Sequence, residues 1–232
     1  MSPIPRRNVA EKLATTLRAA IVKGRFQPGD PLPSERELAE KYAVNRSSVR
    51  EAMKRLEAWG LVKIRHGGAT RVADLLLDAG LGLVPALIES GGEMGRSILR
   101  DLHEVRGLLL GWGAAQAAKK ADPASMARLD ELARQLAEPK TKPGQLQQLD
   151  YDFFHELMLI SGNQLLSLLS RVVRDVYFQS AERFLPLYRA DVFDPRHHRR
   201  AVAAIRARDA AAAAEAMQAH AASALALLEE RV

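Results

Sequence analysis

The chain has 232 residues, of which 47% are hydrophobic, and it contains no cysteine. Disulfide bonds and thiolate metal sites are therefore excluded, and any metal would need nitrogen and oxygen ligands. No apolar run approaches the roughly 20 residues of a membrane helix, and the N-terminal sequence lacks the apolar core of a signal peptide, so we expect a cytoplasmic protein without a membrane partner.

The positive charge is concentrated in the first third of the chain. Residues 1–74 hold 15 lysines and arginines against 8 acidic residues, whereas residues 75–232 hold 19 against 20. A basic module beside a nearly neutral remainder indicates a polyanionic partner such as DNA, although a solvated basic face would explain the charge by itself. We therefore expect two domains with these bounds, and the motifs must decide the partner.

Three helices are expected in the basic domain. The first covers 8–23, with Asn8 as its N-cap. A short second helix begins after Ser34, which starts a capping-box pattern. A brief turn follows, and Asn45 is placed to cap a third helix over 46–59. This order predicts a helix-turn-helix.

A small hairpin is expected directly after the third helix. Gly60 is a helix stop, and the segments LVKIR (61–65) and ATRVA (69–73) have the composition of short strands. The residues HGG join them and place His66 at the tip. The hairpin makes the predicted module a winged helix-turn-helix.

The rest of the chain has an almost purely helical period. A compact antiparallel bundle of seven helices is therefore predicted, and the fold class is mainly α. The expected helices cover 76–90, 95–119, 124–137, 145–161, 163–190, 194–208 and 210–230.

The third helix carries the residue types that read DNA. Arg46 and Arg50 are four residues apart, so they project from one face, and arginine matches the two acceptors of guanine. Arg36 is placed to reach a base or a phosphate, and His66 to enter the minor groove. An exposed helix with ordinary ion pairs would explain the charge but not the hairpin. Three further residues suit phosphate contacts: Ser47, Ser48 and Lys54.

The stretch PLPSERELAEKYAVNRSSVREAMKRLEAWGLVKIRHGG resembles the DNA-binding domain of the GntR family of bacterial transcription regulators. The remainder resembles the effector domain of its FadR subfamily, of the FCD type, in EVRGLLL, FHELMLISGN and HRRAVAAIRARD followed by AMQAH. The resemblance implies a homodimer that binds a palindromic operator, usually as a repressor. It also implies that Arg36, Arg46, Arg50 and His66 contact the DNA.

Three histidines of the helical domain are candidate metal ligands. His198 and His220 are 22 residues apart on consecutive predicted helices, so antiparallel packing would bring them to a similar depth. His155 comes from an earlier helix. Converging neutral imidazoles are typical of a divalent metal site, and we expect zinc or nickel.

The fourth ligand is left open by the sequence. Metal-binding members of the resembled subfamily carry an aspartate four residues before the first histidine, but Tyr151 stands there relative to His155. Asp152 is within reach on a helix, whereas Asp150 lies about 140° around the helix from His155. Asp152 is therefore the predicted carboxylate ligand.

The sequence leaves two interpretations of the helical domain open, and they differ in both the effector and the metal. Arg106, from the EVR segment, is expected either to pair with a small carboxylate effector or to form an internal ion pair with Asp101 or Glu104. The segment LDYDFFHELMLISGN also resembles an acyl-CoA-responsive branch of the subfamily that has no metal site. A regulator of that kind, without a metal, is the second interpretation.

Two other classes of protein are weighed against a ligand-responsive regulator. A metal-dependent hydrolase is the remote alternative: His155 and Glu156 begin a zincin-like motif, but Leu159 stands where the second histidine is needed. No nucleophile elbow, P-loop or dinucleotide fingerprint occurs, so we expect no enzyme activity. A DNA-binding protein without any effector is the third class.

Overall fold

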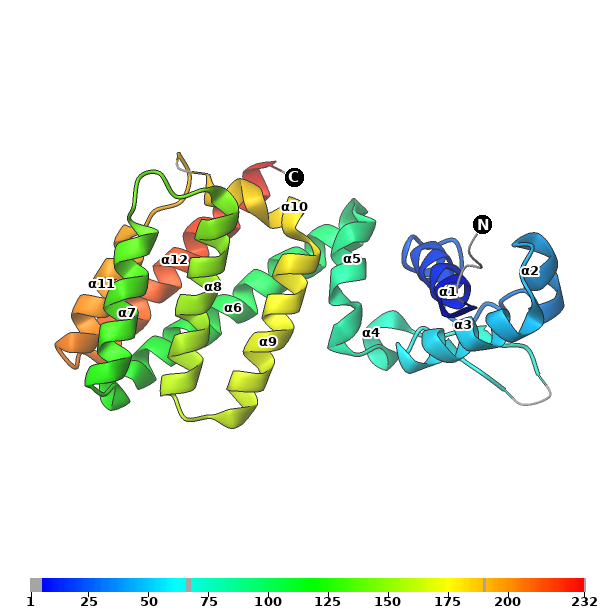
Figure 1. Ribbon diagram of the computed structural model, residues 1–232, viewed down its shortest axis with the longest axis horizontal. Coiled ribbons are helices and arrows are strands. Elements are labelled where there is room, and N and C mark those ends of the chain that lie inside the picture. Colours follow the sequence, from blue (N-terminus) through cyan, green and yellow to red (C-terminus); the bar gives the residue numbers. More distant parts are fainter. Residues whose placement is uncertain (1–5, 66–67, 190, 232) are drawn as a thin grey trace. The chain divides into compact units, whose positions relative to one another are not determined.

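A computed structural model describes residues 6–65, 68–189 and 191–231, which are mainly helical as expected (Figure 1). The chain divides into two compact units, Met1–Gly95 and Arg96–Val232. The sequence predicted a boundary after residue 74. In the structure the segment 75–95 belongs to the first unit instead.

The winged helix-turn-helix module is present in the first unit. Its elements are α1 (Arg6–Val22), α2 (Glu35–Lys41), α3 (Arg46–Ala58), β1 (Val62–Lys63) and β2 (Arg71–Val72). The core of the module is formed by one apolar stripe from α1 and one from α3, and both stripes are buried. Their main members are Leu13, Leu17, Ile21, Val49, Met53 and Leu56.

Two predicted caps fix the positions at which α2 and α3 begin. Ser34 accepts a hydrogen bond from the backbone N–H of Glu37, whose carboxylate accepts from the N–H of Ser34 at 2.8 Å. Asn45 accepts from the N–H of Ser48 at 2.8 Å. These bonds confirm both predicted caps. Each cap satisfies an N–H group of the first helical turn that would otherwise have no partner. The prediction for Asn8 is wrong, since α1 begins at Arg6 and contains Asn8.

The wing is shorter than the sequence predicts. β1 and β2 pair antiparallel with Val62 opposite Val72, and each strand has two residues instead of five. The N–H of Ile64 donates to the carboxylate of Glu57 at 3.1 Å, so the strand leaves the ladder at that point. The predicted tip residue His66 lies outside the described residues.

The single helix expected over 76–90 is broken into α4 (Leu75–Asp78), the 3-10 turn η1 (Leu81–Leu83) and α5 (Val84–Ser90). Gly80 has an extended backbone with ψ 171°, which ends the helical path after α4. Pro85 then lies in the first turn of α5, where a missing N–H costs nothing.

The second unit is a helical bundle. It is built from α6 (Gly92–Lys120), whose first residues belong to the first unit, α7 (Pro123–Leu136), α8 (Pro143–Ile160), α9 (Gln164–Gln179), α10 (Ala181–Phe184), η2 (Leu185–Tyr188), α11 (Arg196–Arg206) and α12 (Ala210–Arg231). The expected helix over 163–190 is interrupted at Ser180, where ψ is 35°.

The packing of the bundle brings distant segments together. α7 contacts both α8 and α11, α8 contacts α9 and η2, and α11 packs along α12 (Figure 1).

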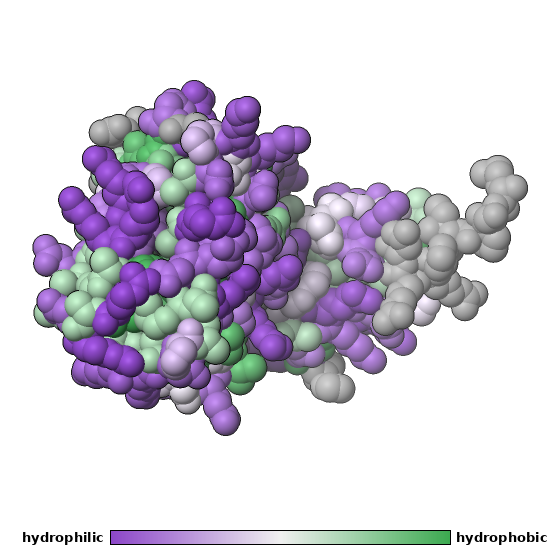
Figure 2. Space-filling view, turned by 60° about the vertical axis from the view of Figure 1, so that its left-hand side comes forward, coloured by the Kyte–Doolittle hydropathy of each residue, from purple (hydrophilic) through white to green (hydrophobic). Residues whose placement is uncertain are grey.

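Hydrophilic residues dominate the face shown in Figure 2, with smaller hydrophobic areas between them. Within the described ranges, no helix combines the length and the apolar character that crossing a bilayer requires.

Candidate functional site

The first candidate site is the exposed surface of α2 and α3. Arg46 and Arg50 are both exposed near the start of α3, and Arg36 is exposed at the start of α2. Ser47 and Lys54 are also exposed on α3. The structure therefore presents these donors to solvent, as reading the major groove from a helix N-terminus requires.

Two details of this surface differ from the sequence-based expectation. Ser48 is only 5% exposed, because its position in the first turn of α3 faces the core, so its hydroxyl is not placed for a phosphate contact. Arg50 is not free, since its Nε lies 2.7 Å from a carboxylate oxygen of Glu35 on α2. Glu35 thus pairs with one of the two arginines that the sequence predicts to read DNA.

The second candidate site is a buried cluster in the bundle. Asp150 on α8, His198 on α11 and His220 on α12 bring one ligand atom each within 4.8 Å of one another. Both histidines direct Nε2 at the same carboxylate oxygen, Asp150 Oδ1, at 2.9 Å from His198 and 3.0 Å from His220. Carboxylate and imidazole ligands in this number suit a divalent transition metal.

The other oxygen of Asp150 is held by two hydrogen-bond donors. Arg106 Nη2 donates to Oδ2 at 2.5 Å, and the hydroxyl of Tyr188 donates to the same atom at 2.8 Å. These two bonds fix the plane of the carboxylate, and its other oxygen, Oδ1, then faces the two histidines. Partners of this kind orient the ligands of a metal site.

The charges of the cluster follow from its burial. Burial raises the pKa of Asp150, but the Arg106 guanidinium and the two histidines outweigh it and hold the pKa well below the usual value. Burial lowers the pKa of His220 to about 4, against the opposing pull of Asp150. Asp150 is therefore ionised and His220 neutral near pH 7, which are the protonation states that metal ligands need.

Two imidazole nitrogens of the cluster are buried without a hydrogen-bond partner. His198 Nε2 lies 2.9 Å from Asp150 Oδ1, and its Nδ1 is buried without a hydrogen-bond partner. His220 Nε2 is close to Asp150 Oδ1, yet the geometry is not that of a hydrogen bond. An unpaired buried nitrogen is costly, and two imidazole nitrogens beside one carboxylate oxygen suit the ligands of a shared cation.

The expected membership of the metal cluster needs correction. His155 lies elsewhere: its Nδ1 contacts Ser170 Oγ at 2.7 Å, and its ring stacks on Tyr151. Asp152 accepts a hydrogen bond from Gln148 at 2.8 Å on the half-buried side of α8. Asp150 takes the carboxylate position instead, because it shares the buried face of α8.

The revised register changes the comparison with metal-binding members of the subfamily. In those proteins a histidine follows the aspartate by four residues, but Phe154 stands four residues after Asp150 and is buried. The chain therefore offers three of the expected ligands. The sequence-based prediction aligned the aspartate–histidine spacing of the subfamily on His155, whereas the structure aligns it on Phe154, one residue earlier.

Arg106 forms an internal ion pair, which was one of the two alternatives, but with a partner that the sequence did not indicate. The expected acidic partners were Asp101 and Glu104 on the same helix, and both are exposed. Arg106 is 3% exposed and faces the opposite way, toward α8. Its guanidinium also lies 5.5 Å from the ring centre of Tyr177.

His103 adds a second buried polar pair beside the cluster. Its Nδ1 donates to the carbonyl of Leu99 at 3.0 Å, because a carbonyl can only accept. Its Nε2 is then the acceptor for the hydroxyl of Tyr177 at 3.2 Å. Burial lowers the pKa of His103 to about 4, with Arg106 as the next cause. No sequence motif marked this pair.

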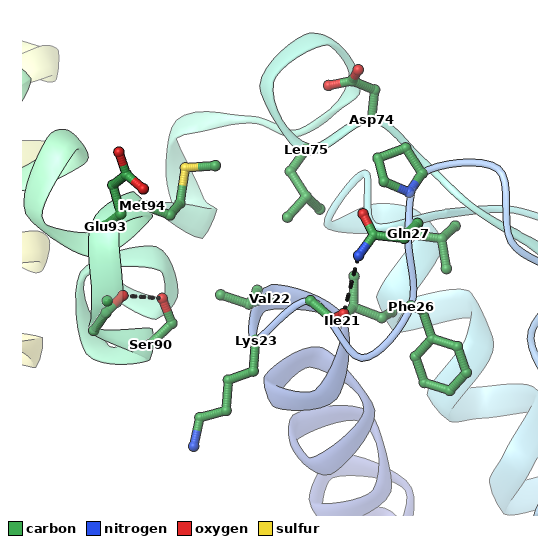
Figure 3. A pocket seen from close by; sticks show the side chains of 15 residues that line it. Ile21, Val22, Lys23, Phe26, Gln27, Asp74, Leu75, Ser90, Glu93 and Met94 are labelled. Carbon is green, nitrogen blue, oxygen red and sulfur yellow. Dashed lines mark hydrogen bonds between the residues drawn. The ribbon is translucent and has the colours of Figure 1, made fainter.

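The first unit contains a separate cavity of about 570 Å³ (Figure 3). It lies between the end of α1, the loop that follows and the turn between α5 and α6, and its apolar lining includes Val22, Phe26 and Met94. Lys23 and Glu93 also line it. None of the predicted DNA or effector contacts lines this cavity.

Comparison with known proteins identifies relatives of nearly the whole chain. Residues 9–72 match the model of the bacterial regulatory proteins of the gntR family, and residues 101–223 match the FCD domain. The HTH-type transcriptional regulator Mce2R of Mycobacterium tuberculosis is 32% identical over 218 residues, which cover 94% of this chain and 90% of the relative.

Two further relatives bear on function and fold. The fatty acid metabolism regulator protein of Pasteurella multocida is 30% identical over 161 residues, 68% of this chain and 64% of the relative. The solved structure of Lar, which controls expression of the Listeria monocytogenes agr system, aligns with a TM-score of 0.60 at 13% identity, over 96% of this chain and 97% of Lar. The second likeness shows a common fold alone.

Proposed function

Because the chain belongs to the gntR family of bacterial regulatory proteins and carries an FCD effector domain, we propose that it is a ligand-responsive transcriptional repressor. It binds a palindromic DNA operator as a homodimer and senses a small carboxylate. A divalent metal, zinc or nickel, held by Asp150, His198 and His220, takes part in the sensing. The matched family and its named relatives are transcriptional regulators, not enzymes.

The observation that carries the metal proposal is the geometry around Asp150 Oδ1. Two imidazoles place Nε2 at 2.9 and 3.0 Å from one carboxylate oxygen, while Arg106 and Tyr188 occupy the other. When bound, the metal would supply an electrophilic centre to which an effector carboxylate can coordinate. Phe154 stands in place of a fourth protein ligand, so coordination positions stay open for that effector.

Arg106 connects the cluster to the effector. It is buried at the inner face of α6 and carries a positive charge that Asp150 balances. An effector carboxylate beside Asp150 would share this guanidinium. Binding must then favour one arrangement of the bundle, since a ligand that binds all states equally shifts none of them.

DNA binding is supported by the exposed arginines at the start of α3. The test is selection of bound duplexes from a random DNA pool by the wild-type protein and by Arg46→Ala. We expect the wild type to enrich a palindrome, and the variant to lose preference at one base position in each half-site. Equal enrichment by both proteins would contradict the assigned recognition helix.

A second candidate is a repressor that responds to acyl-CoA without a metal. The observation in its favour is Phe154, which makes the ligand set incomplete, together with the similarity to the Pasteurella regulator. The two candidates predict different ligands for the same bundle. An acyl chain would need an apolar path into the bundle, whereas a short carboxylate needs only the polar cluster.

Thermal denaturation distinguishes these candidates, because a ligand of the native state raises the melting temperature by mass action. Chelator-treated protein would be titrated with Zn²⁺ or Ni²⁺, then with short carboxylates, and separately with long-chain acyl-CoA. The metal proposal expects a shift with metal and a further shift with carboxylate. A shift with acyl-CoA alone supports the second candidate, and no shift with any compound contradicts both.

A further inference from the structure

The buried cluster of the bundle is closed to solvent. The side chains of Asp150 and His198 are 2% and 0% exposed, and that of His220 is 7% exposed. A divalent ion and a carboxylate that coordinates it both arrive from solvent, so a route to these ligand atoms has to open. The side chains that cover the cluster therefore decide how an effector enters.

Phe193 stands between the two histidines and solvent. The centre of its ring lies 5.7 Å from that of His198 and 5.9 Å from that of His220. Both imidazoles are buried, whereas Phe193 itself is only half-buried. One ring thus lies against both candidate metal ligands and also reaches the surface.

Tyr188 connects this ring to the carboxylate. Its own ring stacks on that of Phe193 with the centres 5.7 Å apart, and its hydroxyl donates to Asp150 Oδ2 at 2.8 Å. We call Tyr188 and Phe193 together the aromatic cover. Each of the three candidate metal ligands is in contact with one member of this cover.

The backbone that carries Phe193 allows its ring to move. Phe153, whose ring meets that of His198 edge-on at 4.9 Å, is fully buried and belongs to the long helix α8. Phe193 instead lies in a turn, where its N–H donates to the carbonyl of Arg189 at 2.8 Å. Rotation about χ1 moves the ring without breaking this bond, so opening costs side-chain contacts alone.

We propose that the aromatic cover is the gate of the effector site, and that a carboxylate effector displaces it on reaching the metal. The proposal rests on the proposed metal-dependent sensing and names the element that regulates access to it. An effector on the solvent side of the imidazoles would take the space that the ring of Phe193 fills, and both cannot be there together. Binding therefore selects the open cover.

Opening of the cover also acts on η2. Tyr188 is the last residue of η2, which packs against α8 and α12. When the ring of Phe193 leaves, Tyr188 loses its stacking partner and keeps its hydrogen bond to Asp150. Since η2 is a single 3-10 turn of four residues, it has few backbone hydrogen bonds of its own to resist a shift.

Carbethoxylation of His220 tests the cover without a metal. Chelator-treated protein would be exposed to diethyl pyrocarbonate, which modifies neutral imidazoles that solvent reaches. His220 is the only histidine between Arg208 and Arg231, so one tryptic peptide reports it alone. We expect Phe193→Ala to be labelled about tenfold faster than the wild type or more, and Phe193→Tyr, which keeps a ring, to stay within about threefold.

Phe178→Ala is the matched control. Phe178 is also a half-buried phenylalanine of the bundle, but its ring contacts Tyr151 and Arg174 instead of the cluster. Its truncation should leave the labelling of His220 within about threefold of the wild type. Circular dichroism melting checks that the variants are folded. Equal labelling of the wild type and Phe193→Ala, or equally fast labelling of both alanine variants, overturns the cover.

Metal exchange separates a gate from a merely structural residue. When protein loaded with Zn²⁺ is mixed with excess chelator, Phe193→Ala should release the ion about tenfold faster or more, with a dissociation constant within about threefold of the wild type. The ligands are unchanged, so both the release and the binding rate rise. An unchanged release rate overturns the gate. So does a dissociation constant that rises in step with the release rate, because Phe193 would then stabilise the bound ion.

The two measurements also distinguish the gate from the proposed sensing. A wild-type chain that binds neither Zn²⁺ nor Ni²⁺ contradicts metal-dependent sensing. The labelling of His220 in the metal-free protein then still decides whether Phe193 covers the cluster. Metal binding by the wild type together with equal exchange and labelling in Phe193→Ala would leave the sensing proposal standing and overturn the gate.

Discussion

Arg106 on α6 and Asp150 on α8 form an ion pair whose side chains are 3% and 2% exposed. The two residues lie 44 positions apart in the chain and meet at 2.5 Å. Their charges cancel in a region where either one alone would be very unfavourable. The carboxylate that is proposed to bind a metal is therefore already balanced by an arginine, so a metal would share the negative charge of Asp150 with Arg106.

Arg106→Ala should destabilise the bundle by about 3–5 kcal/mol, because it leaves Asp150 buried and unpaired. The double variant Arg106→Ala/Asp150→Ala should lose much less than the sum of the two single variants. Urea unfolding in the presence of a chelator would measure these free energies, with a Trp59→Phe background so that Trp112 reports the second unit. Additive single effects would show that the pair is not coupled.

Removal of single ligands should separate the observed cluster from the one expected from sequence. Asp150→Asn, His198→Ala and His220→Ala should each weaken Zn²⁺ or Ni²⁺ binding by about 100-fold or more, because each removes one ligand of three. His155→Ala and Asp152→Asn should bind as the wild type does. Isothermal titration of untagged protein measures the affinities. Loss of binding in His155→Ala with full binding in Asp150→Asn would reverse the assignment.

Local signals were sufficient to predict much of the fold. Ser34 and Asn45 cap their helices through contacts within three residues, so sequence alone places α2 and α3. His198 and His220 were expected to converge because two consecutive helices must turn back on each other. The break of the helix after Asp78 was missed, although Gly80 and Pro85 carried the signal for it.

The membership of the buried cluster depended on which face of α8 turns inward. Asp150 lies in line with Phe153, Phe154 and Leu157, all of which are buried. A lone acidic residue on an apolar face was the available signal, and it was overridden by the spacing from His155. The pairing of Asp150 with Arg106 could not be predicted, because it depends on the contact of helices that are distant in sequence.

The two arginines that are proposed to read bases, Arg46 and Arg50, should contribute differently from Lys54, which is proposed to contact a phosphate. Arg46→Ala and Arg50→Ala should each cost about 1–3 kcal/mol at the selected operator and relax the preference for one base. Lys54→Ala should weaken specific and unspecific DNA alike and reduce the slope of affinity against salt by about one ion. Fluorescence anisotropy at several salt concentrations measures both effects.

Glu35→Gln provides a control for the position of Arg50. The structure holds Arg50 through the Glu35 carboxylate at 2.7 Å, so the neutral amide should loosen the arginine. We expect specific affinity to fall while unspecific affinity rises slightly, because one negative charge leaves the surface. An operator affinity that rises in step with unspecific affinity would mean that Glu35 does not position Arg50.

Acid should destabilise the second unit through His103. Burial lowers the pKa of His103 to about 4, below the value of about 6.5 in the unfolded chain. The unfolded state therefore binds the proton first as the pH falls. The stability is fully present above about pH 6.5 and is lost toward pH 4, by up to about 3 kcal/mol.

The variant His103→Gln should lose less stability than the wild type between pH 7 and pH 4, although it is less stable at pH 7. His220, whose pKa is also about 4, gives a dependence of the same sign, so part of the slope should remain. Urea midpoints at several pH values in the presence of a chelator measure the slopes. Parallel slopes for the two proteins would show that His103 does not titrate in this range.

Gly60→Ala should destabilise the first unit far more than Gly24→Ala. Both glycines have a positive φ, +71° and +73°, so both alanines carry the same backbone strain of about 1 kcal/mol. A Cβ at Gly24 would meet nothing within 4 Å, whereas a Cβ at Gly60 would collide with the backbone carbonyl of Asp78 and lie 2.7 Å from Ala79 Cα. The collision involves backbone atoms that cannot rotate away, so α4 must shift from the end of α3.

We expect losses of stability of about 1 kcal/mol for Gly24→Ala and about 2–4 kcal/mol for Gly60→Ala. Urea unfolding in a Trp112→Phe background measures them, because Trp59 then reports the first unit. Equal losses would mean that the contact between the end of α3 and α4 contributes nothing to the stability of the DNA-binding module.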